Sequence, residues 1–433
     1  MSEANGLERD NGRRTFAFPR PWAAGGWLGV LVAFAALARG VAILVVSFIG
    51  AIVGLIVLWP TGEGREAAIE SADAIGLATD RVRADVVSSS TQTCSFALPE
   101  NPVDCRLLNL DILEGPDAGA TIALPEINLQ IERGLPEFEP GDRIILGYAP
   151  PTDTYFYADV ERSTPLIALT VIFAIVVVAF ARLRGALALL AMAGTVVILV
   201  GFVAPSVLDG NNPIAVAVVA AIIIAFVSLF LSHGFTPTIA VALAGTICAL
   251  FLTLVLSWVF FALSRFTGFA DADALVLPVL NQDLRVSSLL LGGAVIGALG
   301  ALDDVTVTQV ATVAELRHRN PAMAPSELIA SGIRVGRDHI AATVNTLLLA
   351  YAGASLPVLL LFAASDQSLG IVANSEVIAV EIVRTLCGSI GLIAAVPLTT
   401  GLAATVLPPS QSPGGEALDG NPSWDDFAPE DPH

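Results

Sequence analysis

Two adjacent aspartates, Asp303 and Asp304, lie in an apolar stretch that is long enough to cross a lipid bilayer. An ionised side chain in the middle of a bilayer costs about 3 kcal/mol or more, so it is rarely present without a role. A helix turns by about 100° per residue, which separates the two carboxylates and aligns Asp304 with small and polar residues on one stripe. The stripe comprises Gly293, Gly297, Gly300, Asp304, Thr308, Ala311 and Glu315. Small residues allow close helix contact, so we expect Asp304 to face the interior of a helical bundle, against the seventh or eighth helix.

Two later apolar stretches carry further polar residues. Asn345 lies in the first, and Glu381 and Arg384 lie three residues apart on one face of the second. Asp304 is about 27 Å from the outer end of its helix, whereas Arg384 is close to the outer end of its own. We therefore expect two polar clusters. The inner cluster is Asp303, Asp304, Thr308 and Asn345, with Asn345 nearest to Asp304, and the outer cluster is Glu381 with Arg384.

A purely structural role for these residues stays open. Glu381 and Arg384 satisfy each other if they pair, and Asn345 can hydrogen-bond a neighbouring helix. An intramembrane aspartyl protease needs two aspartates that face each other from different helices. Only Asp338, at the mouth of a helix, is available to face Asp303, so the sequence argues against this enzyme.

Other enzyme chemistry has little support in the sequence. All 21 basic residues are arginine, which excludes a lysine Schiff base and a phosphate-loop lysine. The four histidines are scattered without the spacing of metal ligands, at positions His233, His318, His339 and His433. We therefore expect no enzymatic activity, no cofactor and no metal site.

The composition of the chain is that of a multi-pass membrane protein. Of its 433 residues 55% are hydrophobic and 14% are charged, with a mean hydropathy of +0.76, whereas soluble domains carry about 25% charged residues. The apolar runs predict about eight transmembrane helices. The first is 40–59, and the others are 164–182, 185–204, 213–232, 236–263, 286–312, 339–363 and 377–407.

Arginines identify the cytoplasmic side, because positive residues concentrate in cytoplasmic loops. They occur at Arg13, Arg14, Arg20, Arg182, Arg184, Arg317, Arg319, Arg334 and Arg337, all on one side of the predicted topology. Both termini are therefore expected in the cytoplasm of a bacterial cell, with the chain in its cell membrane. The predicted parts are a basic N-terminus with an interfacial lead-in (1–39), the first helix (40–59), an outer domain (60–163), a seven-helix domain (164–407) and a disordered acidic tail (408–433).

The outer domain is predicted to be acidic and rich in β structure. Residues 60–163 contain 19 acids and 7 arginines, which argues against nucleic acid as a partner. Residues 63–83 suggest a short helix. Alternating runs at Leu107–Leu113, Ala120–Leu124, Ile127–Ile131 and Arg143–Tyr148 suggest a small antiparallel sheet or an OB-like barrel. Cys94 and Cys105 have ten residues between them, and the oxidising outer side would allow them to form a disulfide.

Three motifs resemble the YibE/F family of bacterial membrane proteins. They are Gly297-Ala-Leu-Gly-Ala-Leu-Asp-Asp-Val-Thr-Val-Thr308, Asn345-Thr-Leu-Leu-Leu-Ala-Tyr-Ala-Gly-Ala-Ser-Leu-Pro357 and Val383-Arg-Thr-Leu-Cys-Gly-Ser-Ile-Gly391. The order of one helix, an outer domain and seven helices is also similar to that family. The resemblance implies this architecture and does not identify catalytic residues.

Two hypotheses of function follow from the sequence. The first is a gradient-driven transporter, coupled to protons or cations, that moves a small solute or ion of unknown identity along the embedded carboxylates. The second is a non-enzymatic scaffold of the cell envelope that binds a protein partner through residues 60–163. In both cases the lipid bilayer surrounds the helices.

Overall fold

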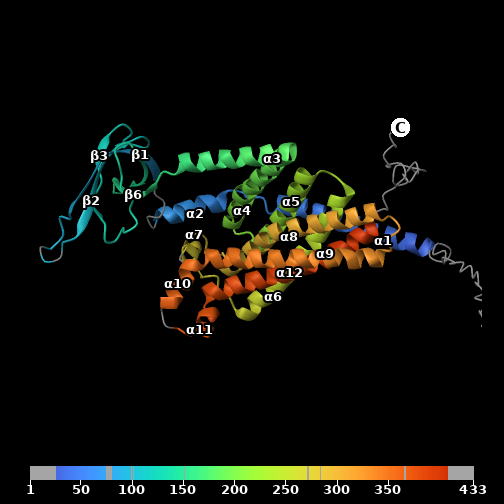
Figure 1. Ribbon diagram of the computed structural model, residues 1–433. Coiled ribbons are helices and arrows are strands. Elements are labelled where there is room, and N and C mark those ends of the chain that lie inside the picture. Colours follow the sequence, from blue (N-terminus) through green and yellow to red (C-terminus); the bar gives the residue numbers. More distant parts are fainter. Residues whose placement is uncertain are drawn as a thin grey trace, which may run out of the picture.

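A computed structural model describes residues 26–74, 80–98, 100, 102–150, 152–270, 273–282, 284–364 and 367–407. The described chain is a bundle of long helices with one antiparallel sheet at its end (Figure 1). The basic residues before position 26 and the acidic tail, which we expected to be cytoplasmic, lie outside the described residues.

Six described helices are long and apolar enough to cross a membrane. They lie within α1 (Gly26–Val57), α3 (Ser163–Ile198) with its continuation, α5 (Pro213–His233), α6 (Pro237–Ser264), α8 (Val286–Arg319) and α12 (Glu376–Val406). A seventh is added if α9 (Pro325–Ala354) and α10 (Leu356–Ala364) form one segment that is bent by 62°. The chain is therefore a multi-pass helical protein, as the composition indicates.

The two helices that we predict at 164–182 and 185–204 lie on either side of a kink at Arg182, within one continuous helical segment. It runs through α3, the π-helical turn η1 (Leu199–Val203) and α4 (Ala204–Leu208). Arg182 interrupts its geometry, with φ 52° and ψ −131°. Figure 1 shows α3 first passing along the edge of the bundle and then turning back across it.

Local sequence explains where two of the central helices begin. The side chain of Asn212 caps α5, and that of Thr236 caps α6. A proline follows each cap, at the position where a helix tolerates the missing N–H. Gly234, with φ 84°, ends α5 and permits the tight connection to α6.

The sheet consists of six antiparallel strands in the order β3-β2-β1-β5-β6, with β4 also paired to β2. The strands are β1 (Asp80–Thr93), β2 (Asp104–Ile112), β3 (Thr121–Ala123), β4 (Ile127–Asn128), β5 (Arg143–Ala149) and β6 (Thr154–Val160). One face packs around fully buried Leu108, Leu110 and Ile144. Pairings between described residues do not join β3 to β6, so they do not close an OB-like barrel.

The predicted helix at 63–83 is shorter than we expected. Helix α2 covers Glu63–Ala74, and residues from Asp80 onward belong to β1. Short helical turns also occur in the connections between the long helices. They are η2 (Asp273–Leu275), α7 (Leu277–Leu280) and α11 (Leu369–Asn374).

Helices α6, α8 and α12 pack very closely at the centre of the bundle. A Cβ atom added to Gly245 of α6 would clash with the Thr399 side chain of α12. One added to Gly391 of α12 would clash with the Thr253 side chain of α6. The glycines thus bring the two backbones together and place threonine hydroxyls between them.

Candidate functional site

A row of buried polar side chains runs along the contact of α6, α8 and α12. Its members are Thr246, Thr253 and Ser257 of α6, Thr306, Gln309 and Arg317 of α8, and Thr385, Ser389, Thr399 and Thr400 of α12. Several of the hydroxyls donate to carbonyls one turn earlier in their own helix, as Thr253 does to Ala249. This pairing satisfies a hydroxyl without another helix, so the row alone does not define a site.

Asp303 is the acidic residue that enters this row. Its side chain hydrogen-bonds Thr246, and the hydroxyls of Thr246 and Thr306 lie 2.6 Å apart. The Oδ1 atom of Asp303 is completely buried and has no hydrogen-bond partner among the described residues. Because an unpaired buried carboxylate oxygen is costly, this position favours either a neutral carboxyl group or a bound cation.

The depth of Asp303 follows from its neighbours. Gly292 of α8 packs against the carbonyl of Pro213, at the start of α5. Asp303 is three turns further along α8, about 16 Å away at 1.5 Å per residue. Since the 21 residues of α5 span about 31 Å, Asp303 is level with the middle of α5.

Asp304 does not face the bundle interior, and this corrects our expectation. Its side chain is 71% exposed, and its Oδ2 lies 3.9 Å from Nε2 of His339 in α9. The stripe that it shares with the glycines is only partly covered. A Cβ atom added to Gly293 or Gly300 would meet nothing within 4 Å, whereas one added to Gly297 would lie 3.1 Å from the Tyr351 hydroxyl of α9. Helix α8 instead turns its larger apolar face to α5, α6 and α12.

The expected inner cluster does not assemble as a unit. Thr308 and Asn345 are exposed, and no hydrogen bond or ion pair links either side chain to Asp303 or Asp304 among the described contacts. The polar side chain found beside Asp304 is that of His339, and not that of Asn345 as we expected. Asp303 belongs to the α6–α8 contact, whereas Asp304 belongs to the α8–α9 side.

The part of the row around Gln309 is tightly packed. The amide nitrogen of Gln309 donates to the carbonyl of Gly332 at 2.9 Å and to the hydroxyl of Thr400 at 2.7 Å. A Cβ atom on Gly336 would lie 2.6 Å from the side chain of Val396. Further along α8, Arg317 donates to the carbonyl of Ala404 at 2.6 Å. These contacts join α8, α9 and α12 around Gln309.

The outer pair lies elsewhere in the bundle, near the start of α12. Arg384 Nη1 donates to Glu381 Oε1 at 3.0 Å, and the two side chains are only 19% and 26% exposed. Nε of Arg384 is buried and has no hydrogen-bond partner among the described residues. Glu381 also lines a cavity of about 200 Å³ between α12 and the bend from α9 to α10.

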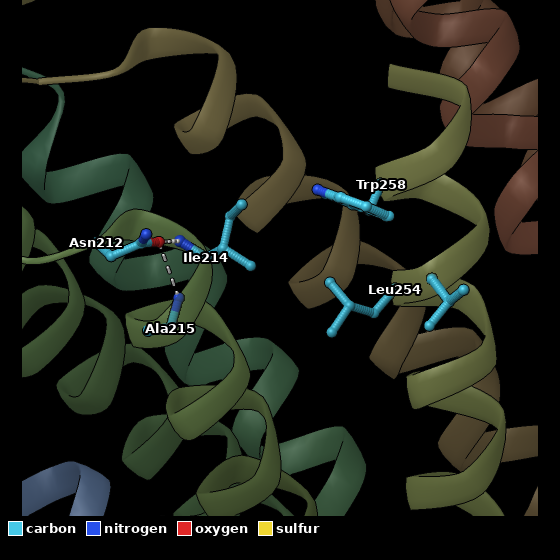
Figure 2. A pocket seen from close by; sticks show the side chains of 6 residues that line it. Asn212, Ile214, Ala215, Leu254 and Trp258 are labelled. Carbon is cyan, nitrogen blue, oxygen red and sulfur yellow. Dashed lines mark hydrogen bonds between the residues drawn. The ribbon is translucent and has the colours of Figure 1, made fainter. Parts of the chain in front are cut away.

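Another cavity, of about 410 Å³, lies between the start of α5 and the C-terminal half of α6. Figure 2 shows its lining from Asn212, Ile214 and Ala215 on one side to Leu254 and Trp258 on the other. The Asn212 oxygen is already used, since it accepts hydrogen bonds from the backbone of Ile214 and Ala215. This space is therefore mostly apolar and, unlike the cavity at Glu381, has no carboxylate among its described lining residues.

Two carboxylates clamp helix ends in the same way. Asp209 accepts hydrogen bonds from the backbone and hydroxyl of Thr61 and from the backbone of Gly62 and Gly64. Burial of the Asp209 carboxyl would raise its pKa, but these hydrogen bonds outweigh burial and hold the pKa below its usual value.

The second clamp has nearly the same set of donors. Glu376 accepts hydrogen bonds from the backbone and hydroxyl of Thr267 and from the backbone of Gly268. Gly268 has φ 98° and Gly62 has φ 92°, which a side chain would oppose. The first clamp thus ties a Thr-Gly turn after α1 to the C-cap residue of α4, and the second ties a Thr-Gly turn after α6 to the first residue of α12.

The outer sheet contains the cysteines. Cys94 and Cys105 form a disulfide, with their Cα atoms 5.0 Å apart. Glu126 lies close enough to complete a three-residue metal-ligand group with them, but sulfurs that bond to each other are not available as thiolates. Hydrogen bonds from the backbone and hydroxyl of Ser95 lower the pKa of the Glu126 carboxyl, so that carboxylate already has its partners.

Sequence reasoning missed Thr246, Thr306 and Gln309 as neighbours of the buried carboxylate. Hydroxyls and amides are common in transmembrane helices, and no local pattern says which of them will meet. His339 was also passed over, because its partner Asp304 lies on another helix.

Comparison with known families extends these observations. The chain matches the family described as YibE/F-like protein over residues 169–409, from within α3 to just beyond α12. Comparison with curated proteins and with solved structures gives no match. Because the family match covers more than half of the sequence, this chain belongs to the YibE/F-like family of membrane proteins.

Proposed function

We propose that the protein is a gradient-driven membrane transporter in which Asp303 binds and releases a proton or another cation. The observation that carries this proposal is the buried Oδ1 of Asp303, which lacks a partner among the described residues. Helix α5 is about as long as the hydrocarbon core is thick, about 30 Å, so a carboxyl level with its middle lies deep in the membrane. Such a group is stable when neutral or when paired with a cation. The hydroxyls of Thr246 and Thr306 would pass the proton along the row.

We further propose eight transmembrane segments. The 46 residues from Ser163 to Leu208 would extend about 69 Å as one helix, more than twice the hydrocarbon thickness. A hairpin at Arg182, where the backbone leaves helical geometry, divides them into two segments. With α9 and α10 as one bent segment, both termini lie on one side. The arginines near the hairpin place that side in the cytoplasm, with the sheet outside a bacterial cell membrane.

The alternative function is a non-enzymatic envelope scaffold that binds a protein through the outer sheet. It is favoured by exposed apolar side chains close to the disulfide, namely Phe96, Leu98 and Ile131. Exposed apolar residues in a small acidic domain suit a protein contact. A scaffold does not need an unpartnered carboxyl between α6 and α8, so we place transport first.

The test uses membrane vesicles that contain the full chain and hold a pH gradient, monitored with a pH-sensitive dye while pools of small solutes are added. We expect one or more pools to collapse the gradient in the wild type and in Asp338→Asn, whose carboxylate is exposed on α9. Asp303→Asn should abolish the response. A solute response that persists in Asp303→Asn, or no response to any pool, would count against the proposal.

A further inference from the structure

Resting on the proposed transport function, we infer that the cavity beside Glu381 binds a small acid with an apolar body, and that Glu381 takes up one proton when the acid binds. Three independent features meet there: a broken helix, a charged pair of low exposure and a cavity of about 200 Å³. Glu381 both lines the cavity and holds Arg384. The cavity is somewhat larger than the 150 Å³ that encloses a benzene molecule.

The broken helix is informative because a membrane-spanning chain rarely leaves helical geometry. Irregular backbone at membrane depth is tolerated where it is buried in protein or lines a cavity. Here α9 ends at Ala354 and α10 begins at Leu356, and Tyr351, Ser355 and Leu359 on both sides of the break line the cavity. Transporters commonly place solute sites at such interrupted helices.

The charged pair decides which class of solute fits. A cationic solute would take Glu381 and leave Arg384 charged and unpaired, since a guanidinium does not lose its proton in proteins. An anionic solute would instead displace Glu381 from Arg384, which does not itself line the cavity but is bonded to Glu381 at 3.0 Å. It would then pair with Arg384, whose buried Nε has no hydrogen-bond partner among the described residues. The released Glu381 then becomes neutral by taking a proton. Only this second exchange leaves no uncompensated charge in the apolar site.

The charges balance in this exchange. The ion pair between Arg384 and Glu381 is replaced by an ion pair between Arg384 and the solute carboxylate, and one proton moves from water to Glu381. Among the described residues, the ionisable groups at this site besides Glu381 are Arg384 on its own helix and Tyr351 of α9, which lines the same cavity. Helix α10 contributes Leu359 to the lining. One acid and one proton therefore enter together.

The rest of the lining is apolar and includes Leu348, Ile378 and Leu386. A carboxylate on a compact hydrocarbon or aromatic body matches both parts of the site, whereas a sugar or another highly hydroxylated acid would bury unpaired polar groups. Benzoate is the probe of this class that we would use, and benzamide is its uncharged counterpart.

The experiment is titration calorimetry of benzoate into the purified full chain in lipid nanodiscs. Buffers with different ionisation enthalpies report the number of protons taken up. We expect one proton per benzoate in the wild type, and an affinity that falls by about tenfold per pH unit at high pH, as linkage requires for one proton. Benzamide should not bind.

Two variants separate proton uptake by Glu381 from binding of the carboxylate by Arg384. Glu381→Gln should bind benzoate without proton uptake and with an affinity independent of pH. The double variant Glu381→Gln with Arg384→Met carries no unpaired charge, so it should fold and should not bind. Glu327→Gln, at the far end of α9, is the control and should match the wild type.

Absence of benzoate binding to the wild type, equal binding by the double variant, or binding without proton uptake would each overturn the inference. The vesicle assay with Asp303→Asn does not depend on benzoate. If the solute response needs Asp303 but is unchanged in Glu381→Gln, the cavity beside Glu381 is not the solute site, whereas the proposed transport function is still supported.

Discussion

The carboxyl groups of Asp303 and Asp304 are neighbours in the chain but lie in different environments. Asp303 hydrogen-bonds Thr246 inside the α6–α8 contact, and its Oδ1 is buried. Asp304 is largely exposed and lies 3.9 Å from His339. Adjacent residues of a helix point about 100° apart, so α8 separates an enclosed carboxyl from an open one.

We expect Thr246→Val to weaken any Asp303-dependent proton movement by about 10- to 100-fold. The substitution removes the hydroxyl beside Asp303 and keeps the shape of the side chain, and a hydrogen bond to a charged group contributes about 1.5–3 kcal/mol. The initial rate of gradient collapse in vesicles measures this. Thr312→Val is the matched control, because the exposed Thr312 hydroxyl bonds only the carbonyl of Thr308 in its own helix. Equal rates for the two variants would contradict the role given to Thr246.

The proposed topology predicts which introduced cysteines react with a membrane-impermeant thiol reagent in intact cells. Gln130→Cys in the outer sheet should react. Arg184→Cys at the proposed hairpin and Met323→Cys between α8 and α9 should react only after the cells are opened. Labelling of Arg184→Cys from outside would contradict the proposal of eight transmembrane segments. The opposite pattern at all three positions would show that the protein has the opposite orientation in the membrane.

Close packing of α6 and α12 predicts a contrast between two glycines of the same helix. A Cβ atom on Gly391 would overlap the Thr253 side chain, whereas one on Gly401 would meet nothing within 4 Å. Gly391→Ala should therefore destabilise the protein by about 1–3 kcal/mol through overpacking. Gly401→Ala should be neutral or slightly stabilising, because alanine favours helices. Thermal unfolding in detergent compares them, and two equally stable variants would show that the helices lie further apart.

The clamp at Asp209 predicts a stability that depends on pH. Both carboxylate oxygens accept hydrogen bonds, and an asparagine supplies only one such oxygen, so Asp209→Asn should lower stability by about 1–3 kcal/mol at neutral pH. The pKa of Asp209 is lowered in the folded protein. Its contribution is therefore present above the unfolded-state pKa of about 3.9 and is lost as the pH falls below it.

Thermal unfolding of the wild type and Asp209→Asn between about pH 3 and pH 7 measures this linkage. The difference between them should shrink toward the acidic end. Glu137→Gln, at an exposed acid of the outer domain, should follow the wild type throughout. A difference that stays constant with pH would mean that the Asp209 charge does not contribute.

The sequence by itself determined the helical membrane class, the position of a sheet between the first long helix and the rest, and the family motifs. Hydropathy decides the membrane class, because a run of about 20 apolar residues is long enough to span a bilayer and is unstable in water. Polar sequence between two such runs marks the position of the sheet, and residue identity alone carries the family motifs. Strand β1 was missed because its second half, from Ser88 to Thr93, is polar and resembles a loop. Only pairing with β2 and β5 makes it a strand.

Tertiary structure alone decided which acidic residue is enclosed. The pattern of small residues around Asp304 predicts a close helix contact, but Gly293 and Gly300 meet no neighbour. The contacts are instead made by Gly245 and Gly391, which draw α6 and α12 together. Periodicity gives the angle between two side chains on a helix but not the direction from which the next helix approaches. That direction depends on packing between segments far apart in the chain, and it turned Asp303 inward and Asp304 outward.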